Sequence, residues 1–250
     1  MTHAYLLGSA GFIADAGLPL TDRGFRYGMS VFETVAIRER RPLLLEPHIQ
    51  SLETSIGRVG FHPPEGWSQT VRAHTLAPPI SEGVVRIYIT AGDREGAESR
   101  VALIFETLPI PTTLSTARAV TVTFTPATPF GKTGNYWPHF LARPASSEEP
   151  ILCGLDGALL GGAMANLFLV RNGEVFTPAA PIRHGVVRTW IDAIESTLTR
   201  ADLATADAAF LTNSRFGLCE LTAIDDRPLP GNATIAAIWR RYRTEVLRVG

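Results

Sequence analysis

The chain has 250 residues, of which 45% are hydrophobic and 19% are charged, and its 23 basic and 24 acidic side chains give a net charge of −1. A chain of this size and composition buries a full core, as one large domain or two modest ones. The balanced charge forms no basic stripe, which argues against binding to nucleic acid or to an acidic membrane surface. We therefore expect its partners to be small molecules or a second copy of the chain.

The apolar stretches are too short to predict a membrane span. The longest charge-free stretches, 119–131 and 157–170, fall short of the roughly 18 apolar residues that cross a bilayer. The N-terminus shows no cationic segment before an apolar stretch, so no secretory peptide is expected. Only two cysteines occur, Cys153 and Cys219, and we interpret both as buried apolar residues of a protein in a reducing compartment. A cytoplasmic location is expected.

The first half of the chain is predicted to be an α+β unit. Apolar residues at spacings of three and four predict a helix over 46–59, and a second helix is expected over 67–76. Stretches rich in β-branched and aromatic residues predict strands at 5–13, 31–37, 84–90 and 101–106. Residues 1–107 are therefore expected to form a small domain.

A segment rich in proline and threonine, 108–118, is predicted to link this domain to a larger α/β domain, 119–250. In the larger domain, strands are expected at 120–125, 151–154, 158–160, 166–170 and 210–212, and helices at 135–143, 187–200 and 233–247. Asn172-Gly173 lies between two apolar stretches, which is typical of a β-hairpin turn.

Lysine usage is unusual, because 22 of the 23 basic residues are arginine and only Lys132 is lysine. A coding bias toward arginine would explain this without any function. The alternative is chemical, since a lysine amine can lose its proton and condense with an aldehyde, whereas guanidinium stays charged. Lys132 directly precedes the predicted helix 135–143, whose N-terminal amides disfavour the protonated amine. This position suits a Schiff base.

Other motifs are weaker when each is considered alone. Gly185-Val-Val-Arg188 opens a predicted helix and could bind an anion, although a simple helix start is the commoner explanation. The segment 211–217 places hydrogen-bonding side chains at the end of a strand. The six histidines show no metal-ligand spacing, so no metal site is expected. No Gly-x-Ser-x-Gly motif supports a serine hydrolase.

Several of these segments occur in an order that resembles the class IV aminotransferases. The resemblance rests on Asp22–Thr34, Lys132–Tyr136, Ala165–Phe168 with Thr177-Pro178, Gly185–Arg188 and Ala206–Ser214. It spans nearly the whole chain, and the first two motifs are the most specific. It implies the two-domain α+β fold type IV of the pyridoxal-phosphate enzymes, which include branched-chain and D-amino-acid aminotransferases and aminodeoxychorismate lyase.

The resemblance also implies roles for individual residues. Lys132 would form the Schiff base with pyridoxal 5'-phosphate and then move the proton at the substrate Cα. The cofactor would be bound by the backbone amides of Val186 and Val187, by the Ser214 hydroxyl and by Tyr136 beside its ring. The substrate pocket would include Tyr27, Phe32 and Arg86. Members of the family are generally dimers, so a homodimer is expected.

Two positions depart from the family pattern, and both belong to cofactor-binding residues. Gly161 stands where the family has a glutamate that pairs with the pyridine nitrogen, and Ser51 stands where it has an arginine that binds the phosphate. Each lost charged hydrogen bond is worth roughly 1.5 to 3 kcal/mol. Two hypotheses therefore remain. The chain is an aminotransferase or aminodeoxychorismate-lyase-like enzyme acting on an amino acid or amino-deoxychorismate, or it is a family member that works without the cofactor or without catalysis.

Overall fold

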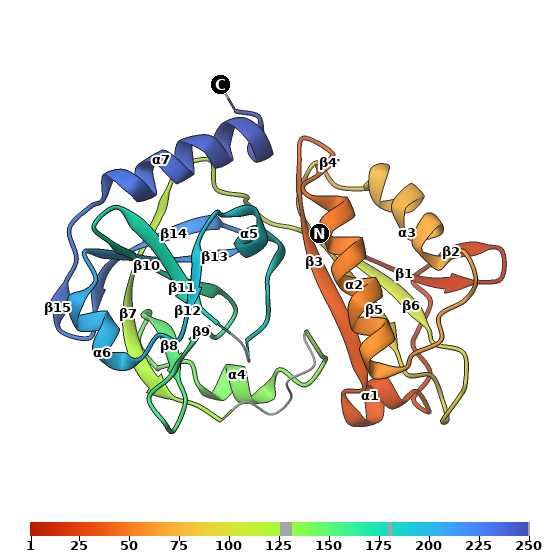
Figure 1. Cartoon of the computed structure of the whole chain (residues 1–250). Coiled ribbons are helices and arrows are strands. Elements are labelled where there is room, and N and C mark those ends of the chain that lie inside the picture. The colour runs from red at the N-terminus through yellow and green to blue at the C-terminus, as the bar shows by residue number, and fades with distance from the viewer. Residues whose placement is uncertain (126–131, 180–181, 250) are drawn as a thin grey trace. The chain divides into compact units, whose positions relative to one another are not determined.

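The computed structural model describes residues 1–125, 132–179 and 182–249, which form two compact units (Figure 1). Unit 1 comprises Met1–Ile110 and Phe130–Asn135, and unit 2 comprises Pro111–Pro129 and Tyr136–Gly250. The division differs from the expected one at two points. Lys132 belongs to unit 1 rather than to the larger second domain, and strand β7 begins at Ser115, inside the expected linker.

Unit 1 is built on an antiparallel sheet with the strand order β2-β1-β6-β5-β3-β4. Its strands are β1 (Thr2–Gly8), β2 (Gly11–Ala14), β3 (Ser30–Arg38), β4 (Arg41–Pro42), β5 (Glu82–Thr90) and β6 (Val101–Thr107). The prediction of one strand over 5–13 was wrong, because the chain turns back between Gly8 and Gly11 and forms a hairpin. Gly11 has a φ of 120°, which favours glycine at this turn.

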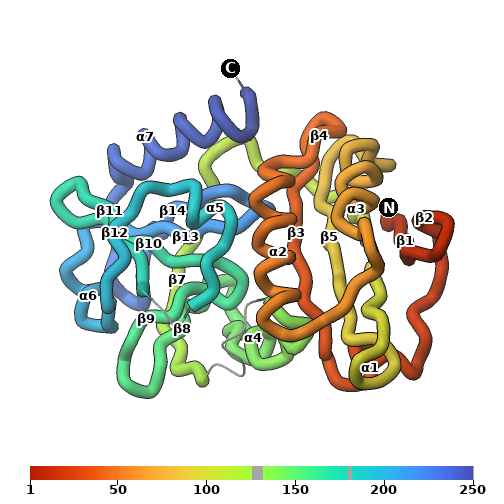
Figure 2. The backbone as a smooth tube through the Cα atoms, turned by 45° about the vertical axis from the view of Figure 1, so that its right-hand side comes forward, coloured from red at the N-terminus to blue at the C-terminus, as the bar shows by residue number. Residues whose placement is uncertain are grey.

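Helices α2 (Leu45–Val59) and α3 (Trp67–Leu76) lie in front of this sheet in Figure 2, and α1 (Arg23–Tyr27) precedes β3. Ile49, Leu52 and Ile56 form the apolar face of α2 and are buried against the sheet. On β3, Val31, Val35 and Ile37 share this core, and Glu33 lies on the same face by strand alternation. Phe32 and Thr34 therefore project from the opposite face of the sheet.

Unit 2 contains a larger mixed sheet with the order β12-β11-β10-β13-β14-β7-β8-β9, and β15 pairs with β14. The pairs β11–β12, β14–β7 and β7–β8 are parallel. The strands are β7 (Ser115–Thr123), β8 (Glu149–Cys153), β9 (Leu159–Gly162), β10 (Asn166–Arg171), β11 (Glu174–Pro178), β12 (Ile194–Ser196), β13 (Ala208–Asn213), β14 (Gly217–Ile224) and β15 (Arg227–Pro228). Asn172-Gly173 joins β10 to β11 as an antiparallel hairpin, as predicted.

The helices of unit 2 are α4 (Trp137–Leu141), α5 (Val186–Trp190), α6 (Arg200–Thr205) and α7 (Ala233–Tyr242), followed by a π-helical turn, η1 (Arg243–Leu247). Figure 2 shows α7 running along the outside of this unit. Trp190 packs edge-on against Tyr242, which ties α5 to the end of α7. None of the helices in the described ranges has both the length and the apolar character that a membrane span requires.

The helix predicted over 187–200 is wrong. Helix α5 ends at Trp190, Ile191 adopts an extended backbone, and 194–196 forms the edge strand β12 paired in parallel with β11. The β-branched residues Val186, Val187, Ile191 and Ile194 lower helix propensity, and pairing with β11 favours the extended form. Strand β14, which was not predicted, completes the hairpin with β13.

Candidate active site

Lys132 lies in a short segment that pairs with the beginning of β3 in unit 1. Thr133 forms a β-bridge with Val31, and the Lys132 carbonyl accepts a hydrogen bond of 2.9 Å from the Phe32 amide. The approach is close enough to require Gly134, since a Cβ there would lie 2.3 Å from the Ser30 hydroxyl oxygen. Backbone contacts therefore hold this segment against β3, the strand that also carries the side chains next to Lys132.

The Lys132 amine contacts two side chains on the open face of β3. Its Nζ donates a hydrogen bond of 3.1 Å to the Thr34 hydroxyl and lies 4.4 Å from the centre of the Phe32 ring. Lys132 is half-buried. A lysine amine placed beside a hydroxyl and an aromatic ring is a group to which an aldehyde can attach.

Further side chains continue this face onto the neighbouring strands. The rings of Phe32 and Tyr88 stack at 5.0 Å, and Thr34 is paired in register with Arg86. Arg86 in turn forms an ion pair with Glu106 of β6. Burial raises the pKa of Tyr88, so its hydroxyl stays protonated at neutral pH. The structure thus brings together Lys132 and two of the three expected substrate-pocket residues, Phe32 and Arg86.

Tyr27, the third of these residues, ends helix α1 and is 60% exposed, with its ring beneath the Arg26 guanidinium at 4.8 Å. The helix is anchored by Asp22, which is fully buried and accepts hydrogen bonds from the Gly24 amide and the Thr90 hydroxyl. Tyr27 therefore lies at the exposed end of an anchored helix.

Ser51 lies on the other side of the sheet. Its hydroxyl donates a hydrogen bond of 3.0 Å to Glu33, whose second oxygen is 2.9 Å from Nδ1 of His48. Glu33 and His48 are buried, at 2% and 1% exposure. Ser51 therefore serves a buried polar cluster between β3 and α2, and it does not replace the charge of the family's arginine.

In unit 2, the candidate phosphate-binding residues begin helix α5. Val186 and Val187 are buried, and as first-turn residues their amides have no acceptor inside the helix. The preceding loop is fixed by Asn166 of β10, which accepts a hydrogen bond from the Gly185 amide at 3.1 Å and donates one to the Arg183 carbonyl at 2.7 Å. A Cβ at Gly185 would lie 2.4 Å from the Asn166 amide oxygen, so only glycine fits.

Ser214 lies in the turn after β13, at the same end of the sheet. Thr212 is paired in register with Asn166, and Asn213 ties the turn to the Met164 carbonyl with a hydrogen bond of 3.2 Å. The Thr212 hydroxyl is buried and has no hydrogen-bond partner in the part of the chain that the structure describes. The structure thus gathers Val186, Val187 and Ser214 around one strand end that still has an unsatisfied hydroxyl.

Gly161 is buried in β9, opposite Leu152, with a φ of 122°. Side chains rarely adopt this conformation, and a Cβ would lie 3.0 Å from the Ala165 carbonyl oxygen. The difference from the family therefore involves the backbone as well as the missing carboxylate. Replacing Gly161 with glutamate would strain this strand.

Tyr136 immediately precedes α4 and stacks on His139 at 4.8 Å. His139 also packs against Phe124 at 4.9 Å, and burial lowers the pKa of its imidazole. Tyr136 is thus part of an aromatic cluster in unit 2 that is neutral at pH 7.

Arg188 was not assigned a role of its own, yet it is nearly fully buried and fixes α5 to β11. It donates to the Pro178 carbonyl at 2.9 Å and to the Thr177 hydroxyl at 3.2 Å, and it forms an ion pair with Glu195 at 3.0 Å. Burial lowers the pKa of this guanidinium. Arg188 holds the helix whose first turn is the candidate anion site.

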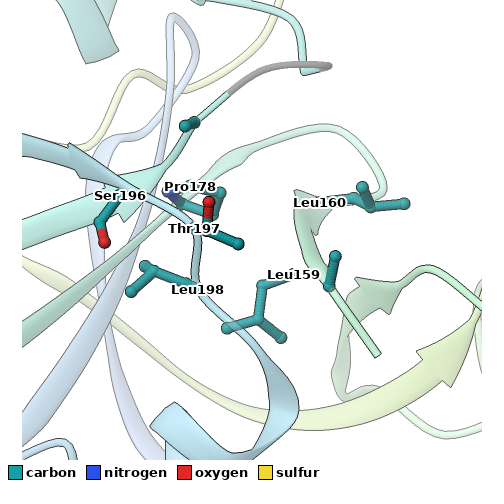
Figure 3. Close-up of a pocket in the computed structure, with 8 residues that line it drawn as sticks. Leu159, Leu160, Pro178, Ser196, Thr197 and Leu198 are labelled. Atoms are coloured by element: carbon teal, nitrogen blue, oxygen red, sulfur yellow. The ribbon is translucent and has the colours of Figure 1, made fainter. Parts of the chain in front are cut away.

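A separate pocket in unit 2, shown in Figure 3, is too small for a cofactor. It is lined by Leu159, Leu160, Pro178 and Ser196–Leu198, and its volume of about 40 Å³ has room for one or two water molecules. Within the described ranges, no three His, Cys, Asp or Glu side chains lie close enough together to hold a metal ion.

The residues fit pyridoxal phosphate in part. Each unit contributes by itself: in unit 1 the Lys132 amine can attach to an aldehyde, and in unit 2 the amides of Val186 and Val187, Ser214 and the unsatisfied Thr212 hydroxyl suit a phosphate. A carboxylate for the pyridine nitrogen is missing at Gly161, and a second cation for the phosphate is missing at Ser51. The donor set therefore supports attachment and phosphate binding more fully than it supports protonation of the ring.

The comparisons with known proteins agree with this architecture. The model of the family "Amino-transferase class IV" matches residues 30–224, and the chain therefore belongs to that family. The fold is the two-domain α+β fold type IV. A hypothetical aminotransferase from Mycobacterium tuberculosis, solved in its PLP-bound form, superimposes with a TM-score of 0.80 at 21% identity, covering 98% of this chain and 99% of that one.

Two curated relatives are similar over almost their whole lengths. One is a putative branched-chain-amino-acid aminotransferase of Methanocaldococcus jannaschii, 26% identical over 259 residues, with 92% of this chain and 90% of the relative covered. The other is an aminodeoxychorismate lyase of Bacillus subtilis, 26% identical over 277 residues, with 93% and 90% covered. A relative named as a putative transferase and one named as a lyase are thus equally identical to this chain, at 26%.

Sequence reasoning missed several residues of these two regions. Thr34, Tyr88 and Glu106 were not singled out, although alternation along β3, β5 and β6 places them on one face with Phe32 and Arg86. Asn166 and Thr212 were quoted only as parts of motifs. Their pairing across β10 and β13 was not expected, and it could have been inferred only from strand register.

Proposed function

We propose that the chain is a pyridoxal-phosphate-dependent enzyme that acts on an amino acid or on amino-deoxychorismate, with Lys132 as the residue that carries the cofactor. The proposal rests mainly on the environment of Lys132, whose amine contacts the Thr34 hydroxyl and the Phe32 ring. It is supported by family membership and by the equal similarity to a transferase and a lyase.

When bound, pyridoxal phosphate supplies an electron sink that makes the substrate Cα proton acidic. The chain's own residues then have distinct tasks. Lys132 accepts and returns that proton through Nζ, and Thr34 fixes where Nζ lies by accepting its hydrogen bond. Phe32 and Tyr88 provide an apolar surface for the substrate.

The phosphate is assigned to unit 2. The Val186 and Val187 amides and the Ser214 hydroxyl would donate to its oxygens, and Thr212 offers a further hydroxyl. Asn166 holds the loop before α5 through its hydrogen bonds to Gly185 and Arg183. Tyr136 would lie beside the pyridine ring of the cofactor.

Gly161 and Ser51 lower the expected cofactor affinity and the expected rate of transamination, but they do not exclude the proposed function. The loss of two charged hydrogen bonds would weaken cofactor binding by about two to four powers of ten. An unprotonated pyridine is also a poorer electron sink, so we expect slow transamination. The conformation of Gly161 and the engagement of Ser51 with Glu33 favour the alternative, a family member that does not use the cofactor.

We further propose that the chain is a cytoplasmic homodimer, which extends the family expectation. Two buried, unpaired cysteines agree with a reducing compartment. Large apolar side chains such as Phe25 and Tyr27 are more than half exposed, as expected of a surface that a second copy covers. Light scattering coupled to size-exclusion chromatography measures the state directly, and a monomer at every concentration would contradict this part.

The test is titration of the purified protein with pyridoxal phosphate, followed by borohydride. We expect a visible absorbance band that borohydride removes and that Lys132→Ala abolishes. Lys132→Arg is the matched control, because it keeps the charge and cannot attach to an aldehyde. A protein that stays colourless at millimolar cofactor while remaining folded would favour the alternative.

A further inference from the structure

The face of unit 1 that carries Lys132 ends in an ion pair. From Lys132, contacts lead to the Phe32 ring at 4.4 Å and from there to the stacked Tyr88 ring at 5.0 Å. Arg86 follows Tyr88 by two residues on β5, and its guanidinium pairs with Glu106 on β6. The row therefore crosses three strands, with the Lys132 amine at one end and two opposite charges at the other.

Strand register places these side chains on one side of the sheet. Phe32 is paired with Tyr88 and Thr34 with Arg86, while Arg86 is paired with Ile104, two residues before Glu106. Directly opposed residues project from the same face, and so do residues two apart on a strand. The ion pair thus belongs to the face of Lys132 and lies away from the core covered by α2.

The ion pair remains accessible to a ligand. The side chains of Arg86 and Glu106 are 33% and 39% exposed, so neither is sealed in the core. Both charges also influence the neighbouring phenol, since Arg86 lowers and Glu106 raises the pKa of Tyr88, in addition to the larger effect of burial. A group that reaches Tyr88 is therefore within the field of both charges.

The pairing decides which substrate groups are accepted there. Arginine is the side chain best suited to bind a carboxylate through two parallel hydrogen bonds, but Nη1 of Arg86 is already engaged by Glu106. A substrate carboxylate would have to compete with Glu106 for this nitrogen and would be repelled by its negative charge. An uncharged side chain meets only Phe32 and Tyr88 and suffers neither penalty.

We propose that Glu106 is a specificity-determining residue, which keeps Arg86 from binding a substrate carboxylate and so selects amino donors with an uncharged side chain over donors with a second carboxylate. This inference rests on the amino-acid form of the proposed function for its reaction, because amino-deoxychorismate itself carries two carboxylates. Its selectivity rests on the ion pair alone.

The experiment removes the competing charge with Glu106→Gln, which keeps the size of the side chain. In the protein saturated with pyridoxal phosphate, we expect the ratio of kcat/KM for glutamate to that for leucine to rise about tenfold or more, mainly through the glutamate term. A second readout needs no turnover. Calorimetry measures the binding of glutarate, which has two carboxylates, and of 4-methylpentanoate, which has one. In Glu106→Gln, glutarate should bind more tightly by a similar factor relative to 4-methylpentanoate.

Three further variants separate this effect from a general change of charge. Glu46→Gln removes the same charge from the Arg72–Glu46 ion pair, which joins α2 and α3 on the other side of the sheet, and should leave the ratio unchanged. Arg86→Gln added to Glu106→Gln should cancel the gain. Glu106→Ala, which cannot hydrogen-bond to Arg86, should act in the same direction as Glu106→Gln.

The outcomes distinguish this inference from the proposed function. If cofactor binds but Glu106→Gln changes glutamate and leucine turnover equally, and glutarate binding does not move, the inference is overturned and the proposed function stands. If no cofactor binds but glutarate binding still tightens in Glu106→Gln and is lost with Arg86→Gln, the proposed function fails and the role of Glu106 in selecting against carboxylates stands.

Discussion

The two candidate regions of this chain use different parts of the polypeptide for chemistry. In unit 1, side chains that project from strands in register surround Lys132, as the Thr34 and Phe32 contacts illustrate. In unit 2, the candidate anion site is mostly backbone, with loops held by Asn166 and Asn213 at the end of a sheet. The function of the first region therefore depends on which side chains are present. The function of the second depends on the position of the backbone.

This difference also explains which features can be lost without losing the fold. Ser51 and Gly161 replace charged residues of the family pattern, yet each is well accommodated, one by a hydrogen bond to Glu33 and one by a φ of 122°. Backbone donors at Val186 and Val187 are not removed by any substitution except proline. The phosphate region can thus persist while the charges around it change.

The largest effect is expected from a side chain added at Gly185, where the backbone of unit 2 lies close to Asn166. Gly185→Ala would bring a Cβ within 2.4 Å of the Asn166 amide oxygen and displace the start of α5. We expect pyridoxal-phosphate affinity to fall by about ten- to a hundredfold, because hydrogen bonds to a charged phosphate are lost. Fluorescence titration measures the change.

Gly231→Ala is the matched control, since nothing lies within 4 Å of a Cβ at that position. It should bind the cofactor like the parent protein. Equal affinities for the two variants would show that the loop at Gly185 does not contact the cofactor.

A second test restores charge in unit 1. Ser51→Arg places a cation beside the buried Glu33 and His48, where Glu33 can pair with it, and we expect cofactor affinity to stay within about threefold of that of the parent protein. Gly161→Glu should not help, because its backbone strain lowers the free energy of unfolding by about 1–3 kcal/mol. Chemical denaturation and cofactor titration of both variants give the comparison, and a stable Gly161→Glu variant would disprove the strain.

A smaller effect is expected from removing the hydroxyl that holds Lys132. Thr34→Val keeps the shape and deletes the acceptor of the 3.1 Å hydrogen bond. One neutral hydrogen bond is worth up to about 1.5 kcal/mol, so kcat should fall by roughly three- to tenfold. Thr34→Ser should recover most of it, and failure of serine to do so would point to packing rather than to the hydroxyl.

The smallest expected effect concerns pH and stability in unit 1. Burial lowers the pKa of His74 below 6.5, so the unfolded chain binds its proton more tightly than the folded one. Its contribution to stability is therefore present above pH 6.5 and declines as pH falls below that value. His74→Phe keeps the ring contacts with Tyr5 and Phe12 and removes this titration.

We expect the loss of unfolding free energy between about pH 7 and about pH 5 to be smaller in His74→Phe than in the parent protein. Denaturant titrations at both pH values measure it. An identical pH dependence in the two proteins would assign the acid sensitivity to other groups, of which His139 is one with a pKa that is also lowered by burial.

Much of unit 1 could be predicted from sequence because its periodicity is strong. The spacing of Ile49, Leu52 and Ile56 predicted α2 within one residue of its start. The prediction failed where local propensity and tertiary pairing compete, as in 187–200, where pairing with β11 produces a strand. Long-range pairing leaves no periodic signal in the segment itself, so such strands are easily misread.

The candidate site was predictable as a set of motifs and less so as an arrangement. The uniqueness of Lys132 and the helix start at Gly185 were visible in the sequence. The assignment of Lys132 to unit 1 was not, because it depends on the bridge between Thr133 and Val31, about 100 positions apart. The burial of Glu33 against Ser51 and the pairing of Arg86 with Glu106 likewise depend on contacts that only the folded chain provides.

The central claim, that Lys132 carries the cofactor, can be tested at the level of the atom. Because the chain contains a single lysine, borohydride reduction in the presence of pyridoxal phosphate leaves Lys132 and the N-terminal amine as the amines that can be labelled. Peptide mass spectrometry should find the phosphopyridoxyl group on the peptide containing Lys132, in near-stoichiometric amount at saturating cofactor. Label confined to the N-terminus, or absent from a folded protein, would contradict the account.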